Sequence, residues 1–304
     1  MLSQTISRIP PQIYVTPKYN EHLTANNTQD DIIKTHRRIY SYQSKSQLSI
    51  HNFQLCQQIG QGQFSKVFLV KNSERFYALK LLDKQWIKKF NLNLQVQREV
   101  DIQSKLKHRN IVELINNFQD NDKIYLITEY CEKGSLYQKQ FTKSKIKEII
   151  KQILTAIQYI HQMGFIHRDI KPENIYLTQD DIVKIGDFGC SNQKRRRRKT
   201  FCGTPDYMSP EIILCSNNSH YCAGYDEKVD IWAIGILLFE LYNNTVPFRD
   251  NNRNKQQDRI CREQIVFKKD DDPQFIDFIQ KCLQKDPNLR ANLYQLLQHP
   301  FLQF

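Results

Sequence analysis

The sequence lacks the features of a secreted or membrane-spanning protein. Its eight cysteines form no CxxC pair, and residues 1–20 contain no apolar core of a signal peptide. The longest apolar run, residues 231–241, is too short to cross a bilayer and is interrupted by Glu240. These absences predict a reducing cytosolic or nuclear setting, free thiols and no membrane segment.

Acidic residues are scarce relative to basic ones. The 304 residues include 32 Asp and Glu against 44 Lys and Arg, which leaves a formal net charge of +12. Such an excess fits nucleic-acid binding, an acidic partner or one locally basic loop, and charge alone does not choose among them. The densest basic run, residues 194–199, can be read as a nuclear-localisation or nucleic-acid patch.

The periodicity of the sequence changes near residue 53. Residues 1–50 contain many Ser, Thr, Asn and Gln and show no sustained period, which predicts a flexible arm. Beyond them, alternating patterns predict five strands, at 53–60, 66–70, 76–82, 111–118 and 123–130. Apolar residues at helical spacing predict helices over 92–106, 146–160, 229–241, 273–284 and 293–298, so the fold class is α+β.

A glycine-rich turn joins the first two predicted strands. Its sequence suits a hairpin whose backbone amides cover nucleotide phosphates, and it comprises Gly60, Gln61, Gly62, Gln63, Phe64, Ser65, Lys66 and Val67. Serine replaces the third glycine of the usual pattern, which restricts positive φ at that position. Taken alone, the stretch can equally be an ordinary glycine turn.

A lysine and a glutamate follow at a spacing that lets them meet. Lys80 lies at the end of Tyr77-Ala78-Leu79-Lys80 on the third predicted strand, and Glu99 lies on the predicted helix, nineteen residues later. A lysine held by a carboxylate can bind α- and β-phosphates, although any one such pair is usually unrelated.

Two later motifs supply the groups that phosphoryl transfer requires. Residues 167–174 read His-Arg-Asp-Ile-Lys-Pro-Glu-Asn, and residues 187–189 read Asp-Phe-Gly. They offer a carboxylate for an attacking hydroxyl and oxygen ligands for Mg²⁺. With Ser-Pro-Glu at 209–211, the ordered set resembles the protein kinase signature.

This resemblance covers residues 53–302 and implies a two-lobed protein kinase fold. The N-lobe, 53–130, would hold a five-stranded antiparallel sheet and one main helix, and the larger C-lobe, 134–302, would be mainly helical. The implied cofactors are ATP and Mg²⁺. Lys171 and Thr204 resemble those of serine/threonine kinases, so the implied acceptors are serine and threonine of protein substrates.

The site residues implied by the resemblance fall into two groups. The catalytic ones are Asp169, which would accept the proton of the hydroxyl, Lys171, which would steady the γ-phosphate, and the pair Lys80 and Glu99. Thr128 would be the gatekeeper, and Asn174 and Asp187 the magnesium ligands. The nucleotide-binding residues would be Gly60, Gln61, Gly62, Gln63, Phe64, Ser65, Val67, Ala78, Lys80, Glu129, Cys131, Glu173, Asn174, Tyr176 and Asp187.

Three stretches resemble the aurora kinases: Arg-Glu-Val-Asp-Ile-Gln-Ser (98–104), Lys-Thr-Phe-Cys-Gly-Thr (199–204) and Asp-Glu-Lys-Val-Asp-Ile-Trp (226–232). Gln103 stands at a core-facing helix position where auroras carry glutamine. Ser65, Thr128, Tyr176 and an insertion at 214–224 depart from the aurora pattern. Tyr176 resembles polo-like and NIMA-related kinases, which are the alternatives.

The kinase and aurora resemblances imply further features. Glu211 and Arg290 would form an ion pair that braces the helical lobe, and Asp230 would orient the catalytic loop. Glu173 and Glu240 resemble an acidic pocket for arginine two residues before the acceptor. Thr200 would be an activating phosphorylation site.

The implied partners are protein substrates and an activating protein at the N-lobe, with a cytoplasmic or nuclear location that includes spindle or centrosome. No membrane partner is implied. The basic run lies in the activation loop, where regulation explains it more simply than nucleic-acid binding, so nucleic acid is not an expected partner.

Three other interpretations of the sequence remain open. A pseudokinase scaffold would keep the fold without catalysis, although every catalytic position is filled. Zinc binding by Cys215, His220 and Cys222 has irregular spacing and lacks a fourth ligand. Cys202 is either a redox-sensitive thiol beside the basic run or an inert packed one.

Overall fold

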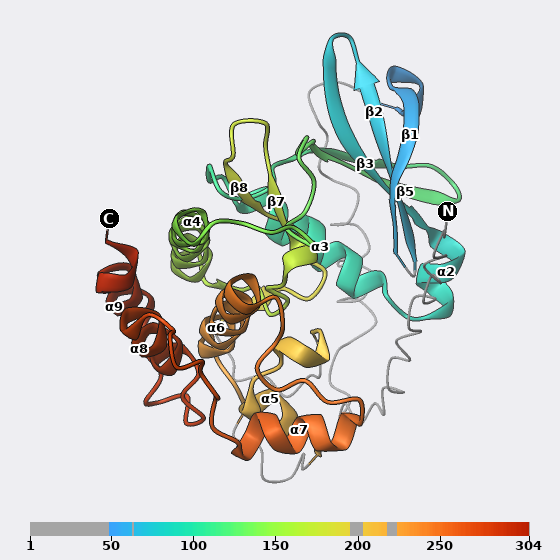
Figure 1. Cartoon of the computed structure of the whole chain (residues 1–304). Helices are drawn as coiled ribbons and strands as arrows, with labels where there is room; N and C mark the ends of the chain where they lie inside the picture. Colours follow the sequence, from blue (N-terminus) through green and yellow to red (C-terminus); the bar gives the residue numbers. More distant parts are fainter. Residues whose placement is uncertain (1–48, 63, 195–202, 218–223, 304) are drawn as a thin grey trace, which may run out of the picture. The chain divides into compact units, whose positions relative to one another are not determined.

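The computed structural model of the chain describes residues 49–62, 64–194, 203–217 and 224–303 (Figure 1). The arm predicted at residues 1–50 lies outside the described residues except for its last two positions, Ser49 and Ile50. Ile50 begins a short 3₁₀ turn, Ile50–Asn52, which leads into the first strand.

A five-stranded antiparallel sheet forms the N-terminal part, as predicted. Its strands lie in the order β1 (Gln54–Gln61), β2 (Ser65–Asn72), β3 (Arg75–Asp83), β5 (Lys123–Glu129) and β4 (Leu114–Gln119). The prediction of a strand from residue 111 is wrong at its start. Ile111 instead pairs with Ile185 in an isolated bridge, which joins the segment before β4 to the other part of the chain.

Two helices pack against one face of this sheet. Helix α2 (Lys84–Lys89) buries Ile87, and α3 (Asn93–Lys105) buries Val96. Both side chains join the cluster formed with Leu82, Leu114 and Leu126. Helix α3 was predicted, whereas α2 was not, because six residues are less than two turns and show no readable period.

The remainder of the chain is mainly helical (Figure 1). Its helices are α4 (Lys143–Gln162), α5 (Pro210–Asn217), α6 (Lys228–Asn243), α7 (Arg253–Arg262), α8 (Pro273–Cys282) and α9 (Leu293–Leu297). Short strands β6 (Phe165–Ile166), β7 (Ile175–Leu177), β8 (Val183–Ile185) and β9 (Asn192–Gln193) pair as β6–β9 and β7–β8. Neither α5 nor α7 was predicted from the sequence.

Helix α6 lies in the main hydrophobic core, as its apolar sequence predicts. Side chains from α4 and α8 belong to the same cluster. A Cβ atom on Gly235 would lie 2.6 Å from the Cβ of Cys282, so glycine is needed for the close approach of α6 and α8. None of the helices within the described part of the chain is long and apolar enough to cross a membrane.

The expectation of free thiols holds for only some of the described cysteines. Cys56, Cys131, Cys261 and Cys282 are free, whereas Cys190 and Cys215 are disulfide-bonded. A disulfide requires only that the fold bring two Cβ atoms within about 3.5–4.5 Å, which spacing along the sequence does not reveal.

The predicted ion pair between Glu211 and Arg290 is present and bidentate. The guanidinium nitrogens of Arg290 lie 2.8 and 3.1 Å from the two carboxylate oxygens of Glu211. The Arg290 side chain is fully buried and also donates to the backbone oxygens of Lys228 and Gln284. It thereby ties α5 and α6 to the segment before α9.

We expect Arg290→Ala to lower the free energy of unfolding by about 3–5 kcal/mol, because it leaves a carboxylate and two carbonyls without their buried partner. The measurement is chemical denaturation of the purified protein. Arg262→Ala is the control, since the pair of Arg262 and Asp258 is largely exposed and should contribute less than about 1 kcal/mol. Equal losses in the two variants would contradict a bracing role for Arg290.

Candidate active site

Lys80 and Glu99 meet as predicted, across the interface of β3 and α3. The Nζ atom of Lys80 lies 2.6 Å from Glu99 Oε1 and 3.7 Å from Asp187 Oδ1. Burial alone would lower the pKa of Lys80, but the carboxylates of Asp187 and Glu99 outweigh it and raise that pKa. The lysine is therefore a fixed positive charge beside two carboxylates, which suits the binding of an anionic phosphate.

Asp187 remains ionised at the same place. The positive charge of Lys80 is the main cause that lowers the pKa of Asp187, and the N–H of Gly189 donates to its Oδ1 at 3.2 Å. Helix α3 contacts this motif as well, because the side-chain amide of Gln95 donates to the carbonyl of Gly189 at 3.0 Å. Sequence reasoning missed Gln95, for which no motif gave a signal.

Gln103 on α3 faces the core, as predicted. Its side chain is buried, and its amide donates to the backbone oxygen of Val112 at 3.0 Å. The polar group is therefore satisfied and need not destabilise the core.

A second cluster surrounds the carboxylate of Asp169. Lys171 Nζ lies 3.0 Å from Asp169 Oδ2 and 2.8 Å from the hydroxyl of Thr204, which itself lies 3.2 Å from Asp169 Oδ1. Asn174 donates from Nδ2 to both the backbone oxygen and Oδ2 of Asp169, each at 2.8 Å. Thr204 was named from the sequence only as a residue that resembles those of serine/threonine kinases. Its contacts make it part of the candidate site.

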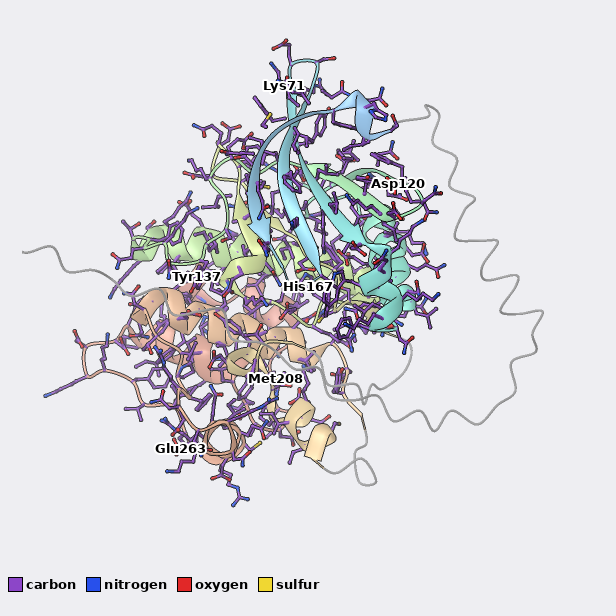
Figure 2. The ribbon with its side chains drawn as sticks, turned by 90° about the vertical axis from the view of Figure 1, so that its right-hand side faces the viewer. Lys71, Asp120, Tyr137, His167, Met208 and Glu263 are labelled. Carbon is purple, nitrogen blue, oxygen red and sulfur yellow. The ribbon has the colours of Figure 1, made fainter. Side chains whose placement is uncertain are left out.

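The buried carboxylate of Asp230 holds the segment that carries Asp169. It accepts hydrogen bonds from the N–H groups of His167 at 2.9 Å and Arg168 at 2.7 Å, and it contacts the His161 ring at 2.8 Å. The predicted role of Asp230 in orienting this loop is confirmed. Figure 2 shows His167 where the sheet meets the helical part of the molecule.

The glycine-rich turn closes between β1 and β2. The N–H of Gly62 donates to the carbonyl of Ser65 at 2.8 Å, and Gly60 pairs with Val67. Ser65 does not adopt positive φ, so serine meets no backbone penalty where the usual pattern has glycine. Gln63, predicted to contact nucleotide, lies outside the described residues.

The predicted adenine-binding segment follows β5. Ala78 pairs with Thr128, whose hydroxyl donates to the Ala78 carbonyl at 3.4 Å. The N–H of Glu129 donates to the carbonyl of Glu113, so this N–H is already used within the protein. Cys131 follows, and its carbonyl accepts from the N–H of Gly134.

Tyr176 on β7 lies against the backbone just before Asp187. Its ring carbon would be 2.9 Å from a Cβ atom on Gly186, so glycine is required for this close approach. Burial raises the pKa of Tyr176 to about 12, which keeps the hydroxyl neutral. The site therefore presents an aromatic side chain next to the cation-binding candidates.

Asn174 and Asp187 are suited to hold a hard cation. The N–H of Gly186 donates to the backbone oxygen of Asn174 at 2.9 Å, which fixes the two motifs side by side. Because Asn174 Nδ2 is used by Asp169, the amide oxygen and the ionised Asp187 carboxylate are the donors that Mg²⁺ prefers.

Acidic side chains gather around Tyr207. Its hydroxyl donates to Glu240, and Asp206 accepts from Gln256 on α7. Burial raises the pKa of Glu240, and the nearby charges of Glu173 and Asp206 raise it further. The predicted neighbours Glu173 and Glu240 thus lie within each other's electrostatic reach, with Asp206 as an addition that the sequence analysis missed.

Several predicted features fall outside the described residues: most of the basic run, Thr200, Cys202, His220 and Cys222. Cys215, considered as a zinc ligand, is disulfide-bonded and so is not available to a metal. No group of three or more potential metal-ligating side chains occurs among the residues that the structure describes.

Comparison with known sequences agrees with this fold. The model of the protein kinase domain matches residues 53–302, and the chain belongs to the protein kinase family. It is 38% identical to mouse Aurora kinase C over 86% of this chain and 95% of the relative. It is 36% identical to the Aurora kinase of Candida glabrata over 84% of this chain and 72% of the relative. It is 35% identical to the Aurora kinase of Saccharomyces cerevisiae over 90% of this chain and 75% of the relative.

Within the kinases, the chain is thus aurora-like over most of its length. Tyr176 is therefore a departure within an aurora-like chain rather than the mark of a polo-like or NIMA-related kinase. The protein is a protein kinase homologous to the aurora serine/threonine kinases, and membership of this family implies that it uses ATP and acts on protein substrates.

We expect Lys80→Met and Asp187→Asn each to reduce phosphoryl transfer by orders of magnitude, because each removes a charge that would bind the phosphates of ATP or its Mg²⁺. The measurement is phosphate incorporation into a protein substrate, with thermal unfolding to verify the fold. Lys71→Met is the control, since Lys71 pairs with the exposed Glu74 at the surface, away from Asp187 and Glu99. Near-normal turnover by a folded Lys80→Met or Asp187→Asn protein would show that the substituted residue does not belong to the active site.

Proposed function

We propose that this kinase transfers the γ-phosphoryl group of ATP to serine or threonine hydroxyls, with residues 53–302 as the catalytic domain and lobes at 53–130 and 134–302. The observation that carries the proposal is the contact of Asp169 with both Lys171 and Thr204. A carboxylate held in this way can orient a hydroxyl and accept its proton. Lys171 beside it supplies positive charge for the γ-phosphate.

The nucleotide would be held by residues on both parts of the chain. Lys80, kept in place by Glu99, would bind the α- and β-phosphates, and the glycine-rich turn would cover them. Asn174 and Asp187 would hold Mg²⁺, which when bound neutralises phosphate charge. The carbonyl of Glu129 and the backbone of Cys131 would bind adenine, next to Tyr176.

A positional peptide library tests this function and its main alternative together. The expected result is phosphate incorporation at serine or threonine with selection for nearby arginine. No transfer to any peptide or protein substrate would support the pseudokinase scaffold, and selection for acidic residues would contradict an aurora-like preference.

The acidic cluster around Tyr207 supports a preference for arginine two residues before the acceptor. Glu173, Asp206 and Glu240 concentrate negative charge there, and a guanidinium pairs with carboxylates in a bidentate way that lysine cannot match. One oxygen of Glu240 is already bonded to the Tyr207 hydroxyl, which orients the carboxylate.

We expect Glu240→Gln to lower the selection for arginine over lysine at this position by about tenfold, in line with the loss of one charge-assisted pair. The measurement is kcat/KM for two peptides that differ only in this residue. Glu263→Gln serves as the control, because Glu263 pairs with Arg259 at the end of α7. An unchanged ratio in Glu240→Gln would exclude Glu240 from the specificity pocket.

We also propose activation by phosphorylation of Thr200. Arg197, Arg198 and Lys199 precede it, so the loop carries arginine where the acidic pocket would select it. A phosphate adds about −1.5 to −2 charges and recruits arginine. Arg168, Arg98 and Arg198 are the candidates. Arg168 bonds to Cys190 O and the Tyr225 hydroxyl, Arg98 lies beside Glu99 on α3, and Arg198 lies outside the described residues.

We expect the Asp187→Asn protein to gain phosphate at Thr200 when it is mixed with active enzyme and ATP, and not when it is incubated alone. Mass spectrometry of the inactive protein before and after mixing measures this. We further expect Thr200→Ala to lower activity, because the loop loses the charge that would pair with arginine. Full activity in Thr200→Ala would rule out the regulatory role.

The partners and location that we propose follow from the aurora relatives. An activating protein would bind the N-lobe, and the kinase would act in cytoplasm or nucleus, including spindle or centrosome. Nucleic acid is not a proposed partner, because a substrate-like loop already accounts for the basic run.

A further inference from the structure

Three aromatic rings link the glycine-rich turn to α2. The ring of Phe64, in the turn, lies 5.0 Å from that of Phe90, the residue that caps α2. The Phe90 ring stacks in parallel on Trp86 at 5.5 Å, and Lys89 Nζ lies 4.9 Å from the centroid of the Trp86 ring. We call Phe64, Phe90 and Trp86 the aromatic ladder.

The ladder is not part of the hydrophobic core. Trp86 is 45% exposed and Phe90 38% exposed, so neither ring is needed to fill the interior. Since Trp86 and Phe90 do not fill the core, their exposed rings have another role, and the contact of Phe90 with Phe64 indicates that they support the glycine-rich turn. Such a pair shifts an equilibrium by roughly 2- to 10-fold beyond the effect of its buried area.

Helix α2 is a rigid support for the ladder. Asp83 caps it by accepting from the N–H groups of Gln85 and Trp86, and Ile87 is buried beneath it. The helix follows β3, the strand that carries Lys80. A ring held by α2 is therefore held at a constant position relative to that lysine.

The strand register shows what the ladder can control. Val67 lies opposite Lys80 and Ser65 opposite Leu82, so the tip of the turn extends beyond Lys80 toward α2. The turn connects β1 and β2 (Figure 1). The contact of Phe64 with Phe90 adds an attachment to α2. A turn already ordered above the lysine loses less freedom when it closes on a ligand.

We infer that Phe90 and Trp86 are positioning residues for the nucleotide: they hold Phe64 and thereby order the glycine-rich turn over Lys80. This inference rests on the proposed ATP site and adds to it a determinant of nucleotide affinity outside the phosphate-contacting residues. Peptide binding, which involves the helical part, does not depend on the ladder.

The test measures binding of Mg-ATP to the full chain by calorimetry and KM values for ATP and peptide separately. We expect Phe90→Ala to raise the Kd and KM for ATP about 2- to 10-fold and to leave the KM for peptide unchanged. Phe90→Tyr, which keeps the ring, should have the Kd and KM for ATP of the wild type.

Phe76→Ala is the matched control, because Phe76 is 49% exposed on β3 beneath Lys71. Figure 2 shows Lys71 at the end of the sheet away from the helical part.

A spectroscopic readout separates this inference from the proposed function. The chain has two tryptophans, and Trp232 is fully buried while Trp86 lies in the ladder. Mg-ATP should therefore change the tryptophan emission of the wild type, and the change should be absent in Trp86→Phe, which still binds.

Failure of the wild type to bind Mg-ATP would overturn the proposed ATP site. Normal binding by Phe90→Ala, or an equal loss in Phe76→Ala, would overturn the ladder alone. An ATP-induced emission change that persists in Trp86→Phe would also count against the ladder.

Discussion

The loop that carries Asp169 depends on one buried carboxylate, that of Asp230. It is fully buried and accepts from two consecutive backbone N–H groups, those of His167 and Arg168. Arg168 adopts a φ of 71°, a conformation that costs energy for a residue with a side chain. The two hydrogen bonds compensate for this strain and fix the backbone immediately before Asp169. Without them, neither the orientation of that carboxylate nor its contacts with Lys171 and Thr204 would be maintained.

The position of Asp230 on α6 makes this anchor rigid. Helix α6 is buried along most of its length and shares its core with α4 and α8. Gly235 lets α8 approach closely, and the pair of Arg290 and Glu211 ties neighbouring segments to the same helix. The ionised carboxylate of Asp230 is tolerated in these apolar surroundings because the loop donates hydrogen bonds to it. The loop in turn keeps its conformation because the core holds this carboxylate in place.

The N-terminal part of the candidate site is attached to this rigid part through contacts of the sheet and of α3. Ile111 pairs with Ile185, Gln95 donates to Gly189, and Lys80 lies 3.7 Å from Asp187. The contacts of Gln95 and Lys80 reach the Asp-Phe-Gly motif. A change in the position of α3 would therefore alter the position of this motif directly. A phosphate on Thr200 that engaged Arg98 would act through the same helix, and the aromatic ladder would act independently of it through α2.

Much of this protein was determined by local sequence alone. Periods of two and 3.6 predicted the sheet and helices α3, α4 and α6, because each is long enough to repeat its pattern. Short motifs predicted Lys80 with Glu99, the Asp230 anchor and the pair of Glu211 and Arg290. Only the tertiary structure decided the rest: helix α2, the bonding of Thr204 to Asp169, the disulfide-bonded state of Cys190 and Cys215, and the contact of Phe64 with Phe90. Helix α2 is too short to show a period, and the side-chain contacts depend on which segments the folded chain brings within a few ångströms, a distance that spacing along the sequence does not encode.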